Sequence, residues 1–118
     1  MLAPADPGTT LLAAAGTSLV GAIVPLMRLT IVMVADIPSG AQEGFQEYES
    51  AVLPLLPRHG GRLERRLRTG DALTEVHIVS FKSQEGLESY LADEERQAHM
   101  GLLDGLDVAQ RVLLVEDV

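Results

Sequence analysis

The chain has 118 residues, of which 47% are hydrophobic, so it is long enough to form one domain with a substantial core. Its formal net charge of −8 argues against a general nucleic-acid-binding protein, because affinity for phosphates comes mostly from Lys and Arg. It has no cysteine, which excludes disulfides, thiolate catalysis and Cys-based metal sites.

Residues 1–26 differ in composition from the rest of the chain, because they contain neither Lys nor Arg. No positive region precedes their apolar run, which argues against a secretory signal. Gly16, Gly21 and Pro25 make the run a poor membrane span. We expect residues 1–26 to be an extension, either flexible or an arm that docks on a partner subunit, or else a stretch upstream of a true start at Met27. We expect a cytoplasmic protein that does not bind membranes.

A single domain is expected over residues 27–118, and it begins with a strand. Residues 29–35 are apolar at both alternating positions, which is typical of a strand buried on both faces. A helix should follow, with Glu43, Glu47 and Glu49 away from its apolar face, and Pro54 should kink or end it. That apolar face consists of Ala41, Phe45, Tyr48, Val52 and Leu55.

The next segment, residues 62–68, carries half of the arginines of the chain. Leu63, Arg65 and Leu67 alternate with a polar set that consists of Arg62, Glu64, Arg66 and Arg68. This alternation predicts a half-exposed strand at the edge of a sheet. The arginines are then a solvated edge, or a local anion site at Arg65 or Arg66. Nucleic-acid binding is not expected, because aromatic residues do not interleave with the charges.

The C-terminal half predicts a strand, a helical region and a closing strand. Residues 75–81 form the more apolar strand, with His77 at its centre. Ser83 should cap a helix that carries Leu87, Tyr90 and Leu91, and Asp93 should open a further helical turn through His99. Residues 101–107 are predicted as a loop, and residues 108–118 as the last strand, apolar on both sides at 112–115.

The order β-α-β-β-α-β predicts an α+β fold, in which a four-stranded antiparallel sheet carries two helices on one face. Strands one and three are then central, and strands two and four lie at the edges. Two helices cover only one face, yet the first strand is apolar on both. The simplest cover for the second face is the sheet of another copy, so we expect a homodimer formed through the sheets.

The chain resembles the dimeric α/β-barrel superfamily, in which two ferredoxin-like sheets pack face to face. The stretches FQEYESAVLPLLPRHGGRLERR (45–66) and FKSQEGLESYLADEERQAH (81–99) are similar to a bacterial family of unknown function in that superfamily. The resemblance covers residues 27–118. It implies relatives such as cofactor-free antibiotic-biosynthesis monooxygenases, haem-degrading enzymes, polyketide cyclases and lactone isomerases. The chain has no Trp and no Asn, which argues against the haem-degrading branch and against oxygenases assisted by those residues.

Two classes of function follow. The chain is either a non-catalytic domain that binds a small apolar or aromatic ligand between sheet and helices, or a cofactor-independent monooxygenase, cyclase or isomerase. His77 and Tyr48 are the catalytic candidates, because a buried neutral imidazole can act as a general base. His77 can equally be a satisfied core residue. The candidate ligand-binding residues are Arg65, Phe45, Tyr90 and His99. No spacing indicates a metal site, and no cofactor is expected.

Overall fold

The computed structural model of this protein describes residues 28–118, so the predicted extension, residues 1–26, lies outside the described residues. The elements are β1 (Leu29–Asp36), α2 (Gln42–Val52), the 3₁₀ helix η3 (Leu53–His59), β2 (Gly61–Arg68), β3 (Thr74–Phe81), α3 (Gln84–Leu91), α4 (Glu94–Asp104) and β4 (Ala109–Val115). The predicted order is confirmed, with the second helical region divided into α3 and α4.

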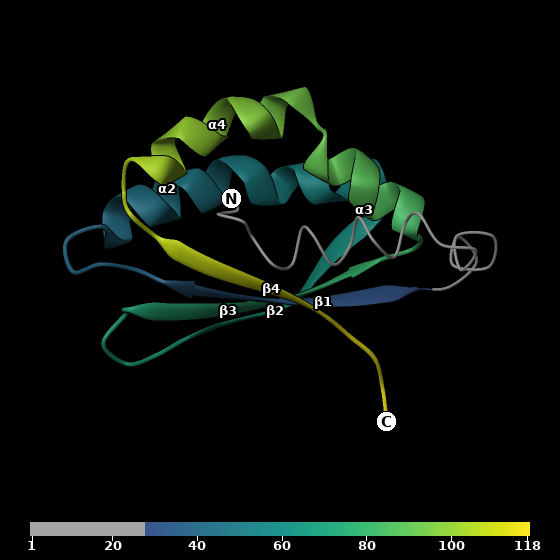
Figure 1. Ribbon diagram of the computed structural model, residues 1–118, viewed down its shortest axis with the longest axis horizontal. Coiled ribbons are helices and arrows are strands. Elements are labelled where there is room, and N and C mark those ends of the chain that lie inside the picture. The colour runs from purple at the N-terminus through teal and green to yellow at the C-terminus, as the bar shows by residue number, and fades with distance from the viewer. Residues whose placement is uncertain (1–27) are drawn as a thin grey trace.

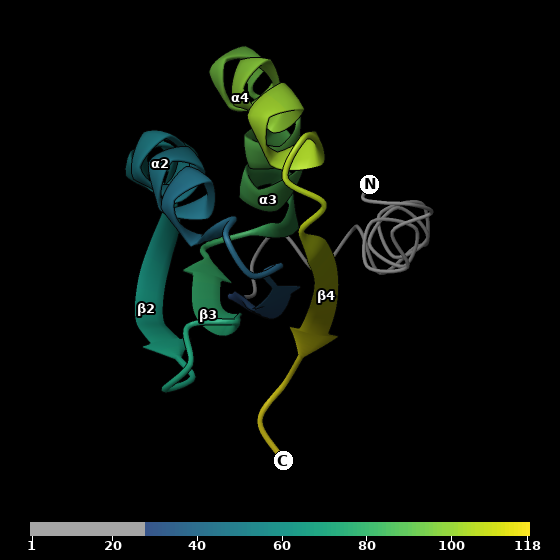
Figure 2. The same cartoon turned by 90° about the vertical axis from the view of Figure 1, so that its left-hand side faces the viewer.

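The four strands form one antiparallel sheet in the order β2-β3-β1-β4. As predicted, the first and third strands are central and the arginine-rich second strand lies at an edge. All the helices lie on one face of the sheet, and the other face carries no helix (Figures 1 and 2). No helix within residues 28–118 is long and apolar enough to cross a membrane.

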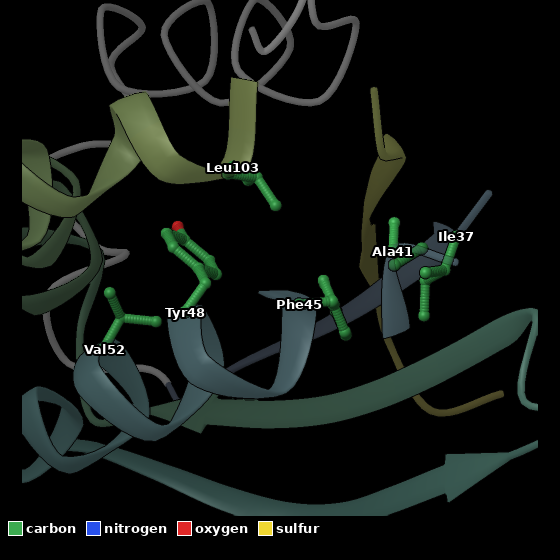
Figure 3. Close-up of a cluster of buried hydrophobic side chains, with 7 residues drawn as sticks. Ile37, Ala41, Phe45, Tyr48, Val52 and Leu103 are labelled. Atoms are coloured by element: carbon green, nitrogen blue, oxygen red, sulfur yellow. The ribbon is translucent and has the colours of Figure 1, made fainter. Parts of the chain in front are cut away.

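The core lies between the helices and the sheet and consists of two clusters. The first lies between α2, α4 and β1, and Figure 3 shows Tyr48 pointing from α2 toward Leu103 of α4. It consists of Ala35, Ile37, Ala41, Phe45, Tyr48, Val52 and Leu103. The second lies between η3, α3 and the sheet, and consists of Ile31, Leu56, Val79, Phe81 and Leu87. The predicted apolar face of the first helix is confirmed, because all five of its residues are buried.

Two helix ends illustrate what the local sequence does and does not determine. The α-helical turns of α2 end at Val52, and Pro54 lies in the first turn of η3, as expected for a residue that lacks a backbone N–H. The predicted loop from residue 101 is wrong in its first half, because α4 continues to Asp104. Leu103 is buried against the first core cluster, and this packing stabilises the last helical turn despite Gly101.

The predicted alternation in β2 is interrupted by a β-bulge. Leu63 pairs with Val79 but Arg65 pairs with Ile78, so one extra residue, Glu64, is accommodated between them. A bulge moves every later side chain to the opposite face of the sheet. Leu63 and the later Arg66 and Arg68 therefore face the helices, whereas Arg65 and Leu67 face the uncovered side, contrary to the pattern read from the sequence.

The face of the sheet that no helix covers is apolar in its centre and basic at its margins. One row across it, from pairing partner to pairing partner, runs Arg65, Ile78, Val32 and Leu113. The next row runs Leu67, Val76, Val34 and Arg111. Within this face Leu113 is 41% exposed and Leu67 is 37% exposed. We call these eight residues the open face.

Candidate functional site

The polar centre of the molecule lies beneath α2, at the end of the sheet formed by β2 and β3. His77 occupies the middle of β3 on the helix-facing side, between its pairing partners Met33 of β1 and Arg66 of β2. It is 2% exposed, and its ring centre lies 6.4 Å from that of Phe45. The sequence prediction that His77 is buried within its strand is therefore confirmed.

Glu75, two residues earlier on the same face of β3, is the hub of the hydrogen-bond network. Its carboxylate is fully buried and accepts hydrogen bonds from Arg66 Nε at 2.9 Å, Arg68 Nε at 2.8 Å and Gln46 Nε2 at 2.6 Å. Burial alone would raise the pKa of Glu75, but the hydrogen bonds from Arg66, His77, Gln46 and Arg68 lower it to about 2. The carboxylate is therefore ionised at neutral pH and can only accept.

This ionisation determines the tautomer of the neutral His77 ring. Nε2 of His77 lies 2.8 Å from Oε1 of Glu75, so Nε2 carries the ring hydrogen and donates a hydrogen bond to the carboxylate. Burial lowers the pKa of His77, which keeps the ring neutral near pH 7. Its second nitrogen, Nδ1, is then an acceptor. This is the arrangement of a general base that a carboxylate orients.

Glu49 of α2 faces that second nitrogen. Its Oε1 lies 4.0 Å from His77 Nδ1, and the residue is only 3% exposed. Burial raises the pKa of Glu49 to about 7, although the charge of Arg66 opposes the shift. Glu49 thus changes protonation near neutral pH beside a neutral imidazole. The expectation that Glu49 lies off the buried face of its helix is wrong, because α2 presents residues 45, 48, 49 and 52 inward.

Tyr48 and Tyr90 line the adjoining part of the helix–sheet layer. The Tyr48 hydroxyl donates to Met100 Sδ of α4 at 3.3 Å, and burial raises the pKa of Tyr48 to about 12. The ring of Tyr90 lies 5.6 Å from the ring of Phe81, centre to centre. Both hydroxyls remain protonated at neutral pH, because burial raises the pKa of Tyr90 as well.

The structure brings together only some of the residues singled out from the sequence. His77, Phe45 and Tyr48 lie in one region between α2 and the sheet, whereas Tyr90, a residue of α3, packs against the second core cluster. Arg65 lies on the open face, on the other side of the sheet from His77. His99 is partly buried on α4 and forms no hydrogen bond or ion pair with another residue of 28–118.

Sequence reasoning did not select four members of this network, Gln46, Glu49, Arg68 and Glu75, and it considered Arg66 only as part of a local anion site. Glu75 carries a readable signal, because it precedes His77 by two residues in a strand and so shares its face. Glu49 carries one too, since it follows Phe45 by four residues and precedes Val52 by three. Within residues 28–118 no group of three His, Asp or Glu side chains is placed to hold a metal ion.

No family model and no curated protein matches this sequence. Solved structures do match its fold. SnoaB, a cofactor-independent oxygenase from Streptomyces nogalater, is 18% identical with a TM-score of 0.63, covering 78% of this chain and 96% of its own. A Nitrosomonas europaea protein assigned provisionally as an antibiotic biosynthesis monooxygenase is 12% identical with a TM-score of 0.66, covering 77% and 90%.

A third match is a protein of unknown function from Agrobacterium tumefaciens, described as a nipsnap family protein. It is 15% identical with a TM-score of 0.57, and the match covers 76% of this chain and 89% of that one. At these identities the matches establish the fold and leave the chemistry open. The chain therefore has the ferredoxin-like α+β fold that antibiotic biosynthesis monooxygenase-type proteins share with proteins of unknown function.

Proposed function

We propose that this chain binds a small apolar or aromatic ligand between its helices and its sheet, with His77 at the polar end of the binding region. The observation that carries the proposal is the Glu75–His77 pair, buried in the centre of the fold and held by Arg66, Arg68 and Gln46. Phe45, Tyr48 and the partly buried Met33 and Met100 provide apolar surface around it.

The energetics of the pair support a functional role. Placing an ionised carboxylate in the core costs several kcal/mol in desolvation. Apolar residues of similar volume often stabilise a fold as well as a buried ion pair does, so stability alone does not require this pair. Strongly perturbed carboxyl and imidazole pKa values also concentrate at functional sites. Here the pKa of Glu75 is lowered to about 2, while that of Glu49, on the other side of the same ring, is raised to about 7.

The same geometry favours, as a second candidate, a cofactor-independent enzyme. Nδ1 of His77 can take a proton from an acidic C–H or O–H of the ligand, which gives an imidazolium beside the Glu75 carboxylate and an anion on the ligand. The carboxylate stabilises the new positive charge and holds the ring in place. SnoaB, which shares the fold, is described as a cofactor-independent oxygenase. Tyr48 is the proton donor that this candidate would use.

We further propose that the open face is covered by the open face of a second copy of the chain. Its central residues, which include Val32, Val34 and Ile78, form a contiguous apolar surface of the kind that marks interaction sites. Covering this face in a homodimer removes that surface from water without changing the helix-facing side. The proposed ligand region then remains in each protomer.

A titration and an oxygen-uptake assay test the binding function and the enzymatic candidate together. The full chain is titrated with 2-naphthol and with phenolic tricyclic ketones, followed by ligand fluorescence, and oxygen uptake is recorded with each. Ligand binding predicts saturation at micromolar concentrations, and the enzymatic candidate predicts uptake that is lost in His77→Gln and retained in the surface control Glu47→Gln. Binding without uptake supports the binding function and excludes an oxygenase acting on these probes. No saturation with any probe overturns both.

A further inference from the structure

Arg96 is a charged residue at a position where the fold calls for an apolar one. It lies in the first turn of α4, whose N-terminus is capped by the Asp93 side chain. Met100 and Leu103 follow it by four and seven residues, so the three share one face of the helix. Met100 accepts a hydrogen bond from Tyr48 of α2, and Leu103 belongs to the first core cluster. Arg96 therefore begins the inward-facing stripe of α4.

The guanidinium of Arg96 is held in place without being neutralised. Its central carbon lies 4.9 Å from the centre of the Tyr90 ring, in a cation–π arrangement. Its Nη1 donates to the Leu91 carbonyl at a long 3.5 Å. Of the carboxylates that the structure describes, none lies within ion-pair distance of Arg96. The positive charge is therefore uncompensated by direct contact.

One donor of this guanidinium is buried and unused. Nε of Arg96 is shielded from solvent and has no hydrogen-bond partner in the described part of the chain. Leaving a buried donor of a charged group unpaired is unfavourable, because the group loses its hydration and gains no hydrogen bond in return. The position thus requires an acceptor that residues 28–118 do not supply.

The surrounding groups define what that acceptor is. Tyr90 covers one face of the guanidinium, so an acceptor must approach in the plane of the group, along the edge that carries Nε. That edge matches the two oxygens of a carboxylate, which bind arginine through parallel hydrogen bonds. The Tyr48 hydroxyl lies in the same layer and donates only to a thioether, a weak acceptor, so a stronger acceptor can recruit it.

We propose that Arg96 is the anchoring residue for a carboxylate on the ligand of this chain, and that the ligand is an aromatic carboxylate. This inference rests on the proposed function and adds the chemical class of the ligand to it. The aromatic part lies against the side chains of the helix–sheet layer, where Tyr90 and Phe81 already pack ring to ring. Arg96 as a residue is partly exposed although its Nε is shielded, so a carboxylate that approaches from solvent has to uncover that edge to bind it. Arg96 acts in binding and orientation.

The test uses two probes of the same size, 2-naphthoate and the neutral ketone 2-acetonaphthone, near pH 7. In the full-length chain labelled with ¹⁵N, the Arg96 Nε–Hε signal should shift and saturate with naphthoate and stay in place with the ketone. Naphthoate should bind at least about tenfold more tightly than the ketone, as expected for a charge-assisted hydrogen bond. A shift that acetate reproduces at the same concentration would identify a general anion site and overturn the aromatic class.

Variants separate this inference from the proposed function. Arg96→Gln should reduce the preference for naphthoate over ketone to about one, and Arg96→Lys, which keeps the charge but lacks the fork, should restore part of it. The matched control is Arg58→Gln, which removes an exposed arginine paired with Asp93 and Glu95 and should keep the full preference. If the Arg96→Gln chain does not fold, the Nε–Hε response of the unaltered chain decides.

The possible outcomes are distinct. Equal affinity for both probes in the unaltered chain overturns the role of Arg96 and leaves ligand binding standing. A preference for naphthoate that survives Arg96→Gln likewise overturns the assignment to this residue. Failure of both probes to bind, together with failure of the phenolic probes, overturns the proposed function and this inference with it.

Discussion

Nε2 of His77 lies 2.8 Å from Oε1 of Glu75, two residues earlier on the same face of a central strand, with both side chains buried. Because the period of a strand is two residues, both side chains project from the same face and can bond each other directly. The pair is supported from β2 by Arg66 and Arg68, which tie the carboxylate to the neighbouring strand. The network thus depends on the register of two strands.

Glu75→Gln is expected to destabilise the fold strongly. The amide keeps the shape of the side chain but removes the charge that pairs with Arg66 and Arg68, whose guanidinium groups are only partly exposed. We expect a loss of about 3 kcal/mol in the free energy of unfolding, measured by urea titration. The matched control is Glu95→Gln, which breaks the exposed pair with Arg58 and should cost less than about 1 kcal/mol. Equal losses would contradict the central role of Glu75.

Glu49 is expected to make the fold less stable as the pH rises toward neutrality. Its pKa is about 7 in the folded chain and 4.5 in an exposed reference, so the folded chain holds this proton more tightly. The contribution is fully favourable below pH 4.5 and is lost as the pH rises through about 7. The shift corresponds to about 3 kcal/mol at most.

Glu49→Gln isolates this effect, because glutamine does not titrate. The difference in unfolding free energy between Glu49→Gln and the unaltered chain should grow in favour of the variant between pH 5 and 7 and then level off. His77, whose pKa is lowered, contributes a slope of opposite sign in both chains, and the variant alters that slope only through the coupling between the two side chains, which lie 4.0 Å apart. A difference that is constant with pH would show that the Glu49 carboxyl is not held protonated by burial.

The pairing of Glu75 with His77 could be predicted from the sequence in part, and the rest of the network could not. The two-residue period of a strand places both side chains on one face without any knowledge of the tertiary structure. The bulge in β2 carries no such signal, since no Gly or Pro marks the residues from Leu63 to Arg65. Without the bulge, Arg66 and Arg68 would face the open side.

The helices show the same division between local and tertiary information. Periodicity located the buried residues of α2, because one apolar face follows directly from the sequence. The end of α4 depends on the packing of Leu103 under Tyr48, which lies 55 positions earlier in the chain. Arg96 lies on the apolar stripe of α4, but the sequence alone does not show which groups bond its guanidinium and which of its donors stay unpaired.

Gly86→Ala is expected to destabilise the fold although alanine favours helices. Propensity alone predicts a gain of about 1 kcal/mol in α3. A Cβ at this position would clash with the backbone carbonyl oxygen of His59, so α3 and η3 would have to move apart. That movement also strains the bond between the His59 ring and Ser89 Oγ, which are 2.6 Å apart. We expect a net loss of about 1–3 kcal/mol in thermal or urea unfolding.

The control for this prediction is Gly101→Ala in α4. No atom lies within 4 Å of a Cβ added there, so only the propensity effect remains. This variant should gain about 0.5–1 kcal/mol. A gain in stability in both variants would show that α3 and η3 can move apart without destabilising the fold.

The last prediction concerns the open face. Leu113→Asp places a charge on an edge strand, in the row that contains Val32 and Ile78, and its side chain points away from the helices. Burying that carboxylate against a second apolar sheet should weaken the homodimer at least about 100-fold, because an unpaired charge would lose its hydration. Circular dichroism should be unchanged, because Leu113 is 41% exposed within one chain.

Sedimentation velocity should show a dimer for the unaltered chain and for the charge-matched control Ala98→Asp on the helical side, and a monomer for Leu113→Asp. A stable monomer of the unaltered chain, or a Leu113→Asp dimer of full strength, would mean that another surface mediates association or that none does.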